Sequence, residues 1–158
     1  MEKTLSIIRK LVKFFVIIFF IYMVLAVFYQ VLGRYIFSYK LGAAAETATF
    51  AQIWMILLAS GIAMRKNMHV GVDILLRKLN IKFQKIVISM STVVIMVFLI
   101  MVLKGSIQLI IVGAQSTSPA ISIPMWIPYL SVPLGITYIM LELLILTFTK
   151  LKQKNKWH

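Results

Sequence analysis

The 158-residue chain contains no cysteine, which excludes disulfides, cysteine-ligated zinc and thiol nucleophiles. Charged residues make up 13% of the chain, whereas a soluble domain usually has about 25%. Only four residues are acidic and two are histidines, so the chain has little material for acid–base or metal chemistry. The polar gaps between apolar runs reach about twenty residues, which is too short to bury a core. We therefore expect no separate soluble domain.

Apolar residues dominate instead, at 61% of the chain with a mean hydropathy of +0.97, and place it in a bilayer. A membrane span needs roughly 20 apolar residues. Their pattern does not alternate with a period of two, so the spans are expected to be helices and not barrel strands. The sequence predicts an all-α integral membrane protein, with residues 1–158 as a single membrane domain of four transmembrane helices, at about 14–33, 46–64, 86–112 and 124–149.

Two further stretches, 3–13 and 72–84, place apolar residues on one helical face and basic residues beside or opposite them. Such helices lie in the plane of the membrane interface, where their cations approach anionic lipids. We expect two in-plane amphipathic helices at the cytoplasmic face. The alternative is that both stretches are the solvated ends of long spans.

Lysine and arginine are distributed unevenly between the two sides of these spans. Fourteen of the seventeen lie in the N-terminal segment, in the 65–85 connection or in the C-terminal tail. Because such residues accumulate on the cytoplasmic side, both termini are predicted to be cytoplasmic and the 33–46 and 104–124 connections external. The net charge of +13 then needs no nucleic acid partner. The first apolar run is too long for a signal peptide, so an uncleaved anchor is expected.

Two acids belong to the apolar stretches. Glu46 begins the second span, where the positive end of a helix favours a carboxylate. Glu142 lies about 12 Å along a helix from Lys150, at a depth where an acid usually faces protein or water. A proton relay and an interhelical tether are both open. We expect a structural contact, with Lys150 or with a lysine of a partner chain.

The stretch RKNMHVGVDILL, residues 65–76, gathers four ionisable residues after an uncharged run. Arg65 and Lys66 end the second span, where cations suit a helix C-terminus. A contact of Asp73 with His69 or with an arginine is expected to fix the corner between this span and the in-plane helix. Metal sites require three or four ligands, and His158 is the only other histidine, so we expect no metal and no other cofactor.

All four prolines fall within residues 119–133, in the external connection and the start of the last span. Pro128 is one of them, and Trp126 and Tyr129 beside it lie where an aromatic belt is expected. This segment is either a rigid start to the span or a docking surface for an external partner. No catalytic constellation or phosphate-binding loop is present, so the chain is not expected to be an enzyme.

The ordered set of these motifs resembles the small membrane subunit (the Q subunit, DctQ-like) of tripartite ATP-independent periplasmic (TRAP) transporters. The string GRYIF, residues 33–37, and LLASGIAMRKNMHVGVDILL, which ends at residue 76, carry much of the resemblance, with IPMWIPYLSVPLG at 123–135. The matching positions are Arg34, Tyr35, Glu46, Trp54, Arg65, His69, Val72 and Asp73. The chain departs from the family pattern at Ala45, where a second acid is common, and at Ala43, where tryptophan is common.

This resemblance implies a scaffold in the bacterial inner membrane that packs against a large transport subunit and stabilises it. A periplasmic binding protein would capture an organic acid, of the dicarboxylate or sialic acid class, and dock on the outer face. The large subunit would carry the acid inward by sodium symport and would hold the substrate and sodium sites. The small subunit's partners would be the large subunit, the binding protein and the lipid bilayer.

Three other functions are alternatives for a small four-span chain. A self-sufficient, homo-oligomeric four-span exporter would use Glu142, although such exporters carry an acid in their first span and this chain has none there. A haem-bearing anchor would need two histidines inside spans. An assembly factor without a part in transport stays open.

Overall fold

The structure of the protein, a computed structural model, describes residues 2–36, 42–65 and 80–152. These residues form the helices α1 (Glu2–Tyr35), α2 (Gly42–Arg65), α4 (Ile81–Ala114), α5 (Trp126–Tyr129) and α6 (Ser131–Lys152). Four helical stretches are long and apolar enough to cross a membrane: Leu5–Tyr35, Gly42–Arg65, Phe83–Ala114 and Trp126–Lys152. For the described residues, the prediction of an all-α chain with four helices long and apolar enough to span a membrane is thereby confirmed.

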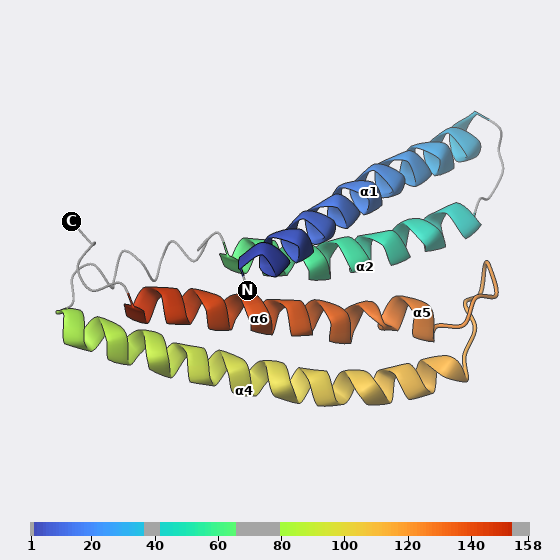
Figure 1. Cartoon of the computed structure of the whole chain (residues 1–158). Helices are drawn as coiled ribbons and strands as arrows, with labels where there is room; N and C mark the ends of the chain where they lie inside the picture. Colours follow the sequence, from blue (N-terminus) through green and yellow to red (C-terminus); the bar gives the residue numbers. More distant parts are fainter. Residues whose placement is uncertain (1, 37–41, 66–79, 153–158) are drawn as a thin grey trace.

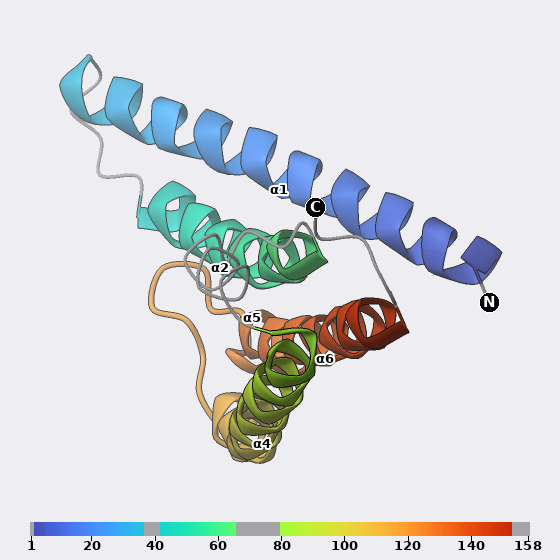
Figure 2. The same ribbon diagram turned by 90° about the vertical axis from the view of Figure 1, so that its left-hand side faces the viewer.

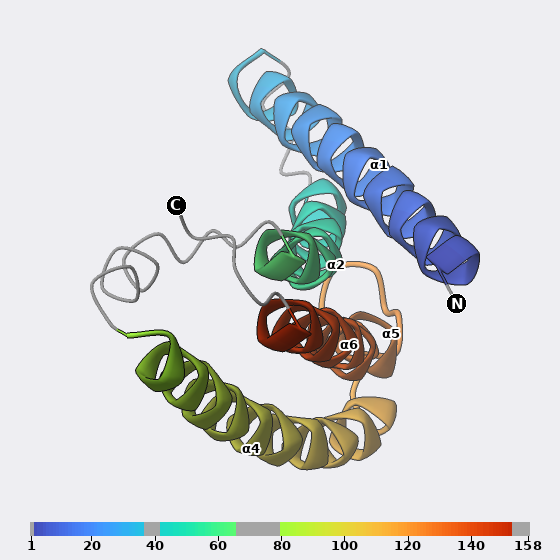
Figure 3. The same cartoon turned by 60° about the vertical axis from the view of Figure 1, so that its left-hand side comes forward.

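Helix α6 lies at the centre of the arrangement, between α2 and α4, and α1 crosses the outer side of α2 (Figure 1). The views in Figures 2 and 3 place α1 and α4 on opposite flanks of the molecule. The flanking helices α1 and α4 expose many large apolar side chains, whereas α6 contains seven buried residues. Their exposure follows from their position, because each has a neighbour on one side only.

Small residues allow α2 and α6 to approach closely, as is common between membrane helices. A side-chain carbon added at Gly61 would lie 2.3 Å from the Tyr138 ring, and one added at Gly135 would lie 2.6 Å from Leu57 Cβ. Ala48 and Ala51 of α2 are also buried. Of the small residues Ala48, Ala51, Ala59, Gly61 and Ala63 along α2, the structure buries Ala48, Ala51 and Gly61.

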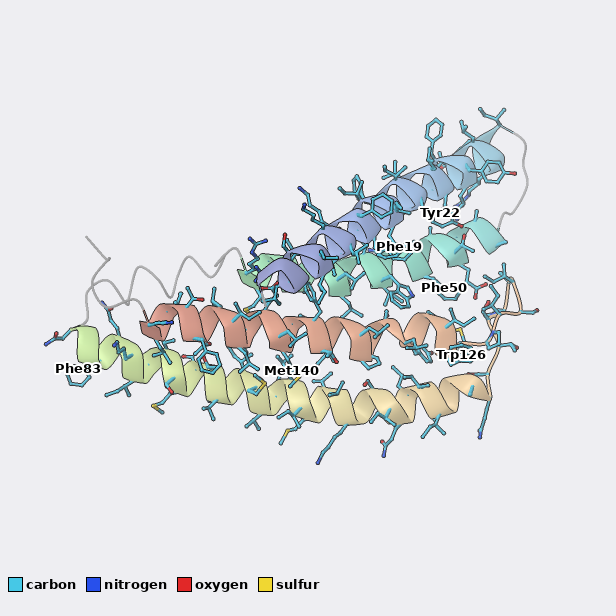
Figure 4. The ribbon with its side chains drawn as sticks, in the orientation of Figure 1. Phe19, Tyr22, Phe50, Phe83, Trp126 and Met140 are labelled. Atoms are coloured by element: carbon cyan, nitrogen blue, oxygen red, sulfur yellow. The ribbon has the colours of Figure 1, made fainter. Side chains whose placement is uncertain are left out.

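The outer contacts are made by larger side chains. On the α4 side, Leu99, Ile136 and Leu143 form a buried cluster, and Met140 of α6 packs against it (Figure 4). Thr92 and Thr147 share a hydrogen bond of 2.9 Å between α4 and α6. On the α1 side, Phe19 stacks on Trp54 with ring centroids 6.0 Å apart.

Helix α1 is continuous where the sequence predicted two elements. The predicted boundary between an in-plane helix at 3–13 and a span at 14–33 has no counterpart, because residues 3–32 include no glycine or proline that would interrupt a helix. A helix of 34 residues is about 51 Å long, well beyond the roughly 30 Å of a hydrocarbon core. The position of residues 3–13 relative to a bilayer stays a prediction.

The last predicted span, 124–149, consists of two helices. The division at Leu130 has a local cause: Pro133 has no N–H to donate to the Tyr129 carbonyl, so the helical pattern is interrupted there. The Ser131 hydroxyl donates to the Pro128 carbonyl at 2.6 Å and bridges the division. Helix α4 also begins earlier than the predicted span at 86–112.

Part of the predicted cytoplasmic corner lies outside the described residues. This applies to His69, to Asp73 and to most of the in-plane helix predicted at 72–84. The last residues of that predicted helix, 81–84, belong to α4.

Candidate functional site

Glu142 lies in the middle of α6 and is the most deeply buried ionisable side chain among the described residues, with 2% of its surface exposed. Helix α6 is covered by α2 on one side and α4 on the other, so a side chain at this position has little contact with water. An uncompensated carboxylate in such surroundings would be strongly unfavourable. Its hydrogen-bond partners therefore decide whether α6 can hold it.

Arg9 of α1 supplies the compensating charge. Its Nε donates to Glu142 Oε1 and its Nη2 donates to Oε2, both at 2.7 Å. This side-on, two-bond geometry is the strong form of the arginine–carboxylate pair. Because α1 otherwise packs mainly on α2, the pair ties α1 directly to the central helix.

Tyr138 completes the surroundings of the carboxylate one helical turn before it. Its hydroxyl donates to Glu142 Oε1 at 3.2 Å. Its ring lies against the backbone of Gly61, which leaves room for the ring because it has no side chain. Three helices therefore meet at this cluster: α1 supplies Arg9, α6 supplies Tyr138 and Glu142, and Gly61 of α2 lies against the Tyr138 ring.

Arg65 lies beside this cluster, in the last turn of α2. Together with Arg9 and Glu142 it lines an open cavity of about 460 Å³. Arg65 is exposed, and among the described residues it has neither an ion pair nor a hydrogen bond. The cluster thus contains two guanidinium groups and one carboxylate.

Glu46 marks a second polar site, at the opposite end of α2. Its Oε2 accepts hydrogen bonds from the backbone N–H groups of Ala120, at 3.0 Å, and Ile121, at 3.2 Å. Both residues belong to the connection between α4 and α5, whose two arms pair through Thr117 and Pro124. Glu46 therefore holds this connection against the start of α2. An interaction with the helix dipole alone, as predicted from the sequence, would not attach the connection.

The remaining predicted residues lie apart from the Glu142 cluster. Arg34 lies over the ring of Tyr35 at 6.0 Å, and Tyr35 is 78% exposed. Trp54 packs between α1 and α2, Trp126 is partly exposed at the start of α5, and Pro128 is fully buried. The structure brings Glu142 together with Arg65 but with none of the other candidates among its described residues.

Two residues of the cluster, Arg9 and Tyr138, were missed from the sequence. The predicted partner of Glu142 was Lys150 or a lysine of a partner chain, whereas its hydrogen bonds go to Arg9 and Tyr138. Arg9 was assigned to the basic face of a separate in-plane helix, which placed it away from α6. The spacing of four between Tyr138 and Glu142 was a usable signal, because residues four apart lie on the same face of a helix.

Comparison with known proteins places the chain in a family. The family model described as tripartite ATP-independent periplasmic transporters, DctQ component, matches residues 23–153. This range includes Glu46, Arg65 and Glu142, whereas Arg9 lies before it.

Individual relatives carry related names. The chain is 36% identical over 110 residues, 65% of its length, to the isethionate TRAP transporter permease protein DctMQ of Oleidesulfovibrio alaskensis, covering 17% of that protein. It is 28% identical over 90 residues, 56% of its length, to the C4-dicarboxylate TRAP transporter small permease protein DctQ of Rhodobacter capsulatus, covering 40% of it. It is also 29% identical to the Vibrio cholerae protein of the same name. That match extends over 84 residues, which are 53% of the present chain and cover 36% of the relative.

These matches span well under two thirds of the length of each relative. The family model, in contrast, matches most of the present chain. The chain belongs to the family of the DctQ component, the small permease subunit of TRAP transporters.

Proposed function

We propose that this protein is the scaffold of a TRAP transporter: it packs against the large membrane subunit and stabilises it during sodium-coupled, binding-protein-dependent uptake of an organic acid. The observation that carries this proposal is the internal use of its carboxylates. Glu142 is held by Arg9 and Tyr138, and Glu46 is held by two backbone amides. Among the described residues, both carboxylates thus serve the cohesion of the chain.

The exposed surface supports the same role. Helices α1 and α4 flank the structure and present large apolar side chains outward, including Phe28 on α1 and Phe98 on α4. Such faces suit both lipid and the helices of a second membrane protein. The proposed substrate class follows the relatives, whose names refer to isethionate and C4-dicarboxylates. Sialic acid is included in the proposed substrate class only because of the family resemblance.

Uptake measurements separate this scaffold from an exporter that uses Glu142. In cells that contain the large subunit and the binding protein, we expect sodium-dependent uptake of the transported acid only when this chain is also present. Glu142→Gln should lower the amount of assembled complex, while the uptake rate per complex and its sodium dependence stay close to those of the unmodified protein. Loss of turnover in fully assembled Glu142→Gln complexes would contradict the proposal and favour the exporter.

We also propose an inner-membrane location with cytoplasmic termini and an external 115–125 connection, based on the distribution of lysine and arginine. Because the chain has no cysteine, single introduced cysteines report orientation without background. In intact cells, a membrane-impermeant maleimide should label Gln115→Cys in the turn after α4, whereas Lys152→Cys at the end of α6 should react only after permeabilisation. The reverse labelling pattern would refute this orientation.

A further inference from the structure

The cavity beside the Glu142 cluster has features of a ligand site. Its volume of about 460 Å³ lies within the range of about 300–1,000 Å³ found for sites that hold small organic molecules. Residues from three helices line it: Leu5 and Arg9 from α1, Arg65 from α2, and several from α6. The cavity is therefore formed only when these helices pack together.

Two guanidinium groups at this cavity retain unused hydrogen-bond donors. Arginine has five N–H donors, and Arg9 commits only its Nε and Nη2 to Glu142, so its Nη1 is unpaired among the described residues. Arg65 has no hydrogen bond or ion pair within the described part of the chain. Guanidinium groups with free N–H donors bind phosphate well.

The carboxylate in the cavity wall does not cancel this attraction. Both oxygens of Glu142 accept hydrogen bonds from Arg9, and Oε1 also accepts one from Tyr138. The pair of Arg9 and Glu142 is neutral overall, so the charge of Arg65 leaves the cavity with a local excess of one positive charge. An anionic group is therefore favoured there.

Apart from Thr149, the rest of the lining is apolar. Leu5, Ile145 and Leu146 form this part of the wall. Beyond Leu5 on the same side of α1, Ile8 and Phe15 are 38% and 48% exposed. Apolar surface thus continues from the charged cavity along a helix expected to cross the membrane. A ligand with an anionic head and aliphatic chains would match both parts.

We propose that this cavity binds the phosphate-bearing headgroup of an anionic phospholipid. The phosphate contacts Arg65 and the free edge of Arg9, and the acyl chains lie over the exposed apolar face of α1. In the orientation proposed above, the cavity opens at the cytoplasmic leaflet. Anionic lipids are present in that leaflet, and basic cavities between membrane helices bind their headgroups there. The bound lipid would then fill the angle between α1 and α6, next to the ion pair that joins them.

The test measures binding of phosphatidylglycerol to the purified, delipidated full chain in a neutral detergent, with phosphatidylcholine as the zwitterionic comparison. The unmodified protein should bind phosphatidylglycerol at least about fivefold more tightly, the value for about 1 kcal/mol per interfacial cation. Arg65→Gln should abolish most of this preference. Arg34→Gln is the matched control, because Arg34 is also exposed in the last turn of its helix, far from the cavity.

Inorganic phosphate distinguishes the two sources of the anion. If millimolar phosphate does not displace phosphatidylglycerol, a lipid is the ligand; if it displaces the lipid fully, the cavity is a site for free phosphate and the proposal fails. Equal losses in Arg65→Gln and Arg34→Gln would also overturn it, because any surface cation would then suffice. Should Arg65→Gln not yield a folded protein, equal binding of the two lipids by the unmodified chain would overturn the proposal by itself.

Discussion

Replacing Arg9 by glutamine should be among the most destabilising single changes at any charged position of this chain. The substitution leaves the Glu142 carboxylate buried in α6 without its cation, and breaking a buried ion pair in this way costs about 3–5 kcal/mol. We expect about 3 kcal/mol, the lower end, because 22% of the Arg9 side chain is exposed. Denaturant unfolding of the purified chain in mixed micelles measures the change.

Two further variants make this prediction specific. Lys10→Gln removes the same charge from an adjacent, exposed position of α1 and should change the free energy of unfolding by well under about 1 kcal/mol. Glu142→Gln should cost less than Arg9→Gln, since the cation it leaves unpaired is partly exposed to water. The double variant should be less destabilised than the sum of the two single ones. Equal stabilities of Arg9→Gln and Lys10→Gln would show that the ion pair does not hold α1 to α6.

Replacing Gly135 by alanine should destabilise the contact between α2 and α6. The new methyl group would lie 2.6 Å from Leu57 Cβ and 3.3 Å from the Leu57 carbonyl carbon. These atoms belong to the backbone of α2 or are attached to it, so the helices must separate to make room. Such overpacking costs about 1–3 kcal/mol, and thermal unfolding in detergent would report it as a lower midpoint.

Gly105→Ala in α4 is the matched control, because nothing lies within 4 Å of a side-chain carbon added there. Alanine is favoured over glycine inside a helix by about 1 kcal/mol, so this variant should raise the midpoint. The same chemical change is therefore expected to have opposite signs at the two positions. If both variants raise the midpoint, α2 and α6 do not pack as closely as the structure shows.

The sequence predicted the helices better than their contacts. The four apolar runs determine where membrane-spanning helices form, because a bilayer requires about 20 apolar residues for each. Helix ends were less predictable. Helix α1 continues through its basic segment because helix formation needs no apolar side chains, so the change from basic to apolar residues at position 14 does not interrupt it.

The partner of Glu142 shows most clearly what the sequence could not supply. A structural contact was expected, but the two residues that make it, Arg9 and Glu142, are 133 positions apart. Their meeting depends on α1 continuing as one helix and crossing α2 at an angle that brings its first turns over α6. Neither condition follows from hydrophobic periodicity.

Glu46 gives the same lesson on a smaller scale. The sequence placed it near a helix N-terminus, where the dipole alone accounts for an acid. Its hydrogen bonds instead go to Ala120 and Ile121, 74 and 75 positions away. The proline-rich connection was expected to be rigid, and its contact with Glu46 adds an attachment that proline content does not reveal.

The central claim is that this chain is the scaffold of a larger transport subunit. It is tested most directly by identifying the proteins that are bound to the chain in its native membrane. The chain would be tagged, extracted in a gentle detergent from the cells that produce it, and analysed by mass spectrometry of the intact assembly. We expect a stoichiometric complex with a much larger polytopic membrane protein. Purification of the chain alone, as a homo-oligomer, would contradict the scaffold role and make Glu142 the first candidate for a transport residue.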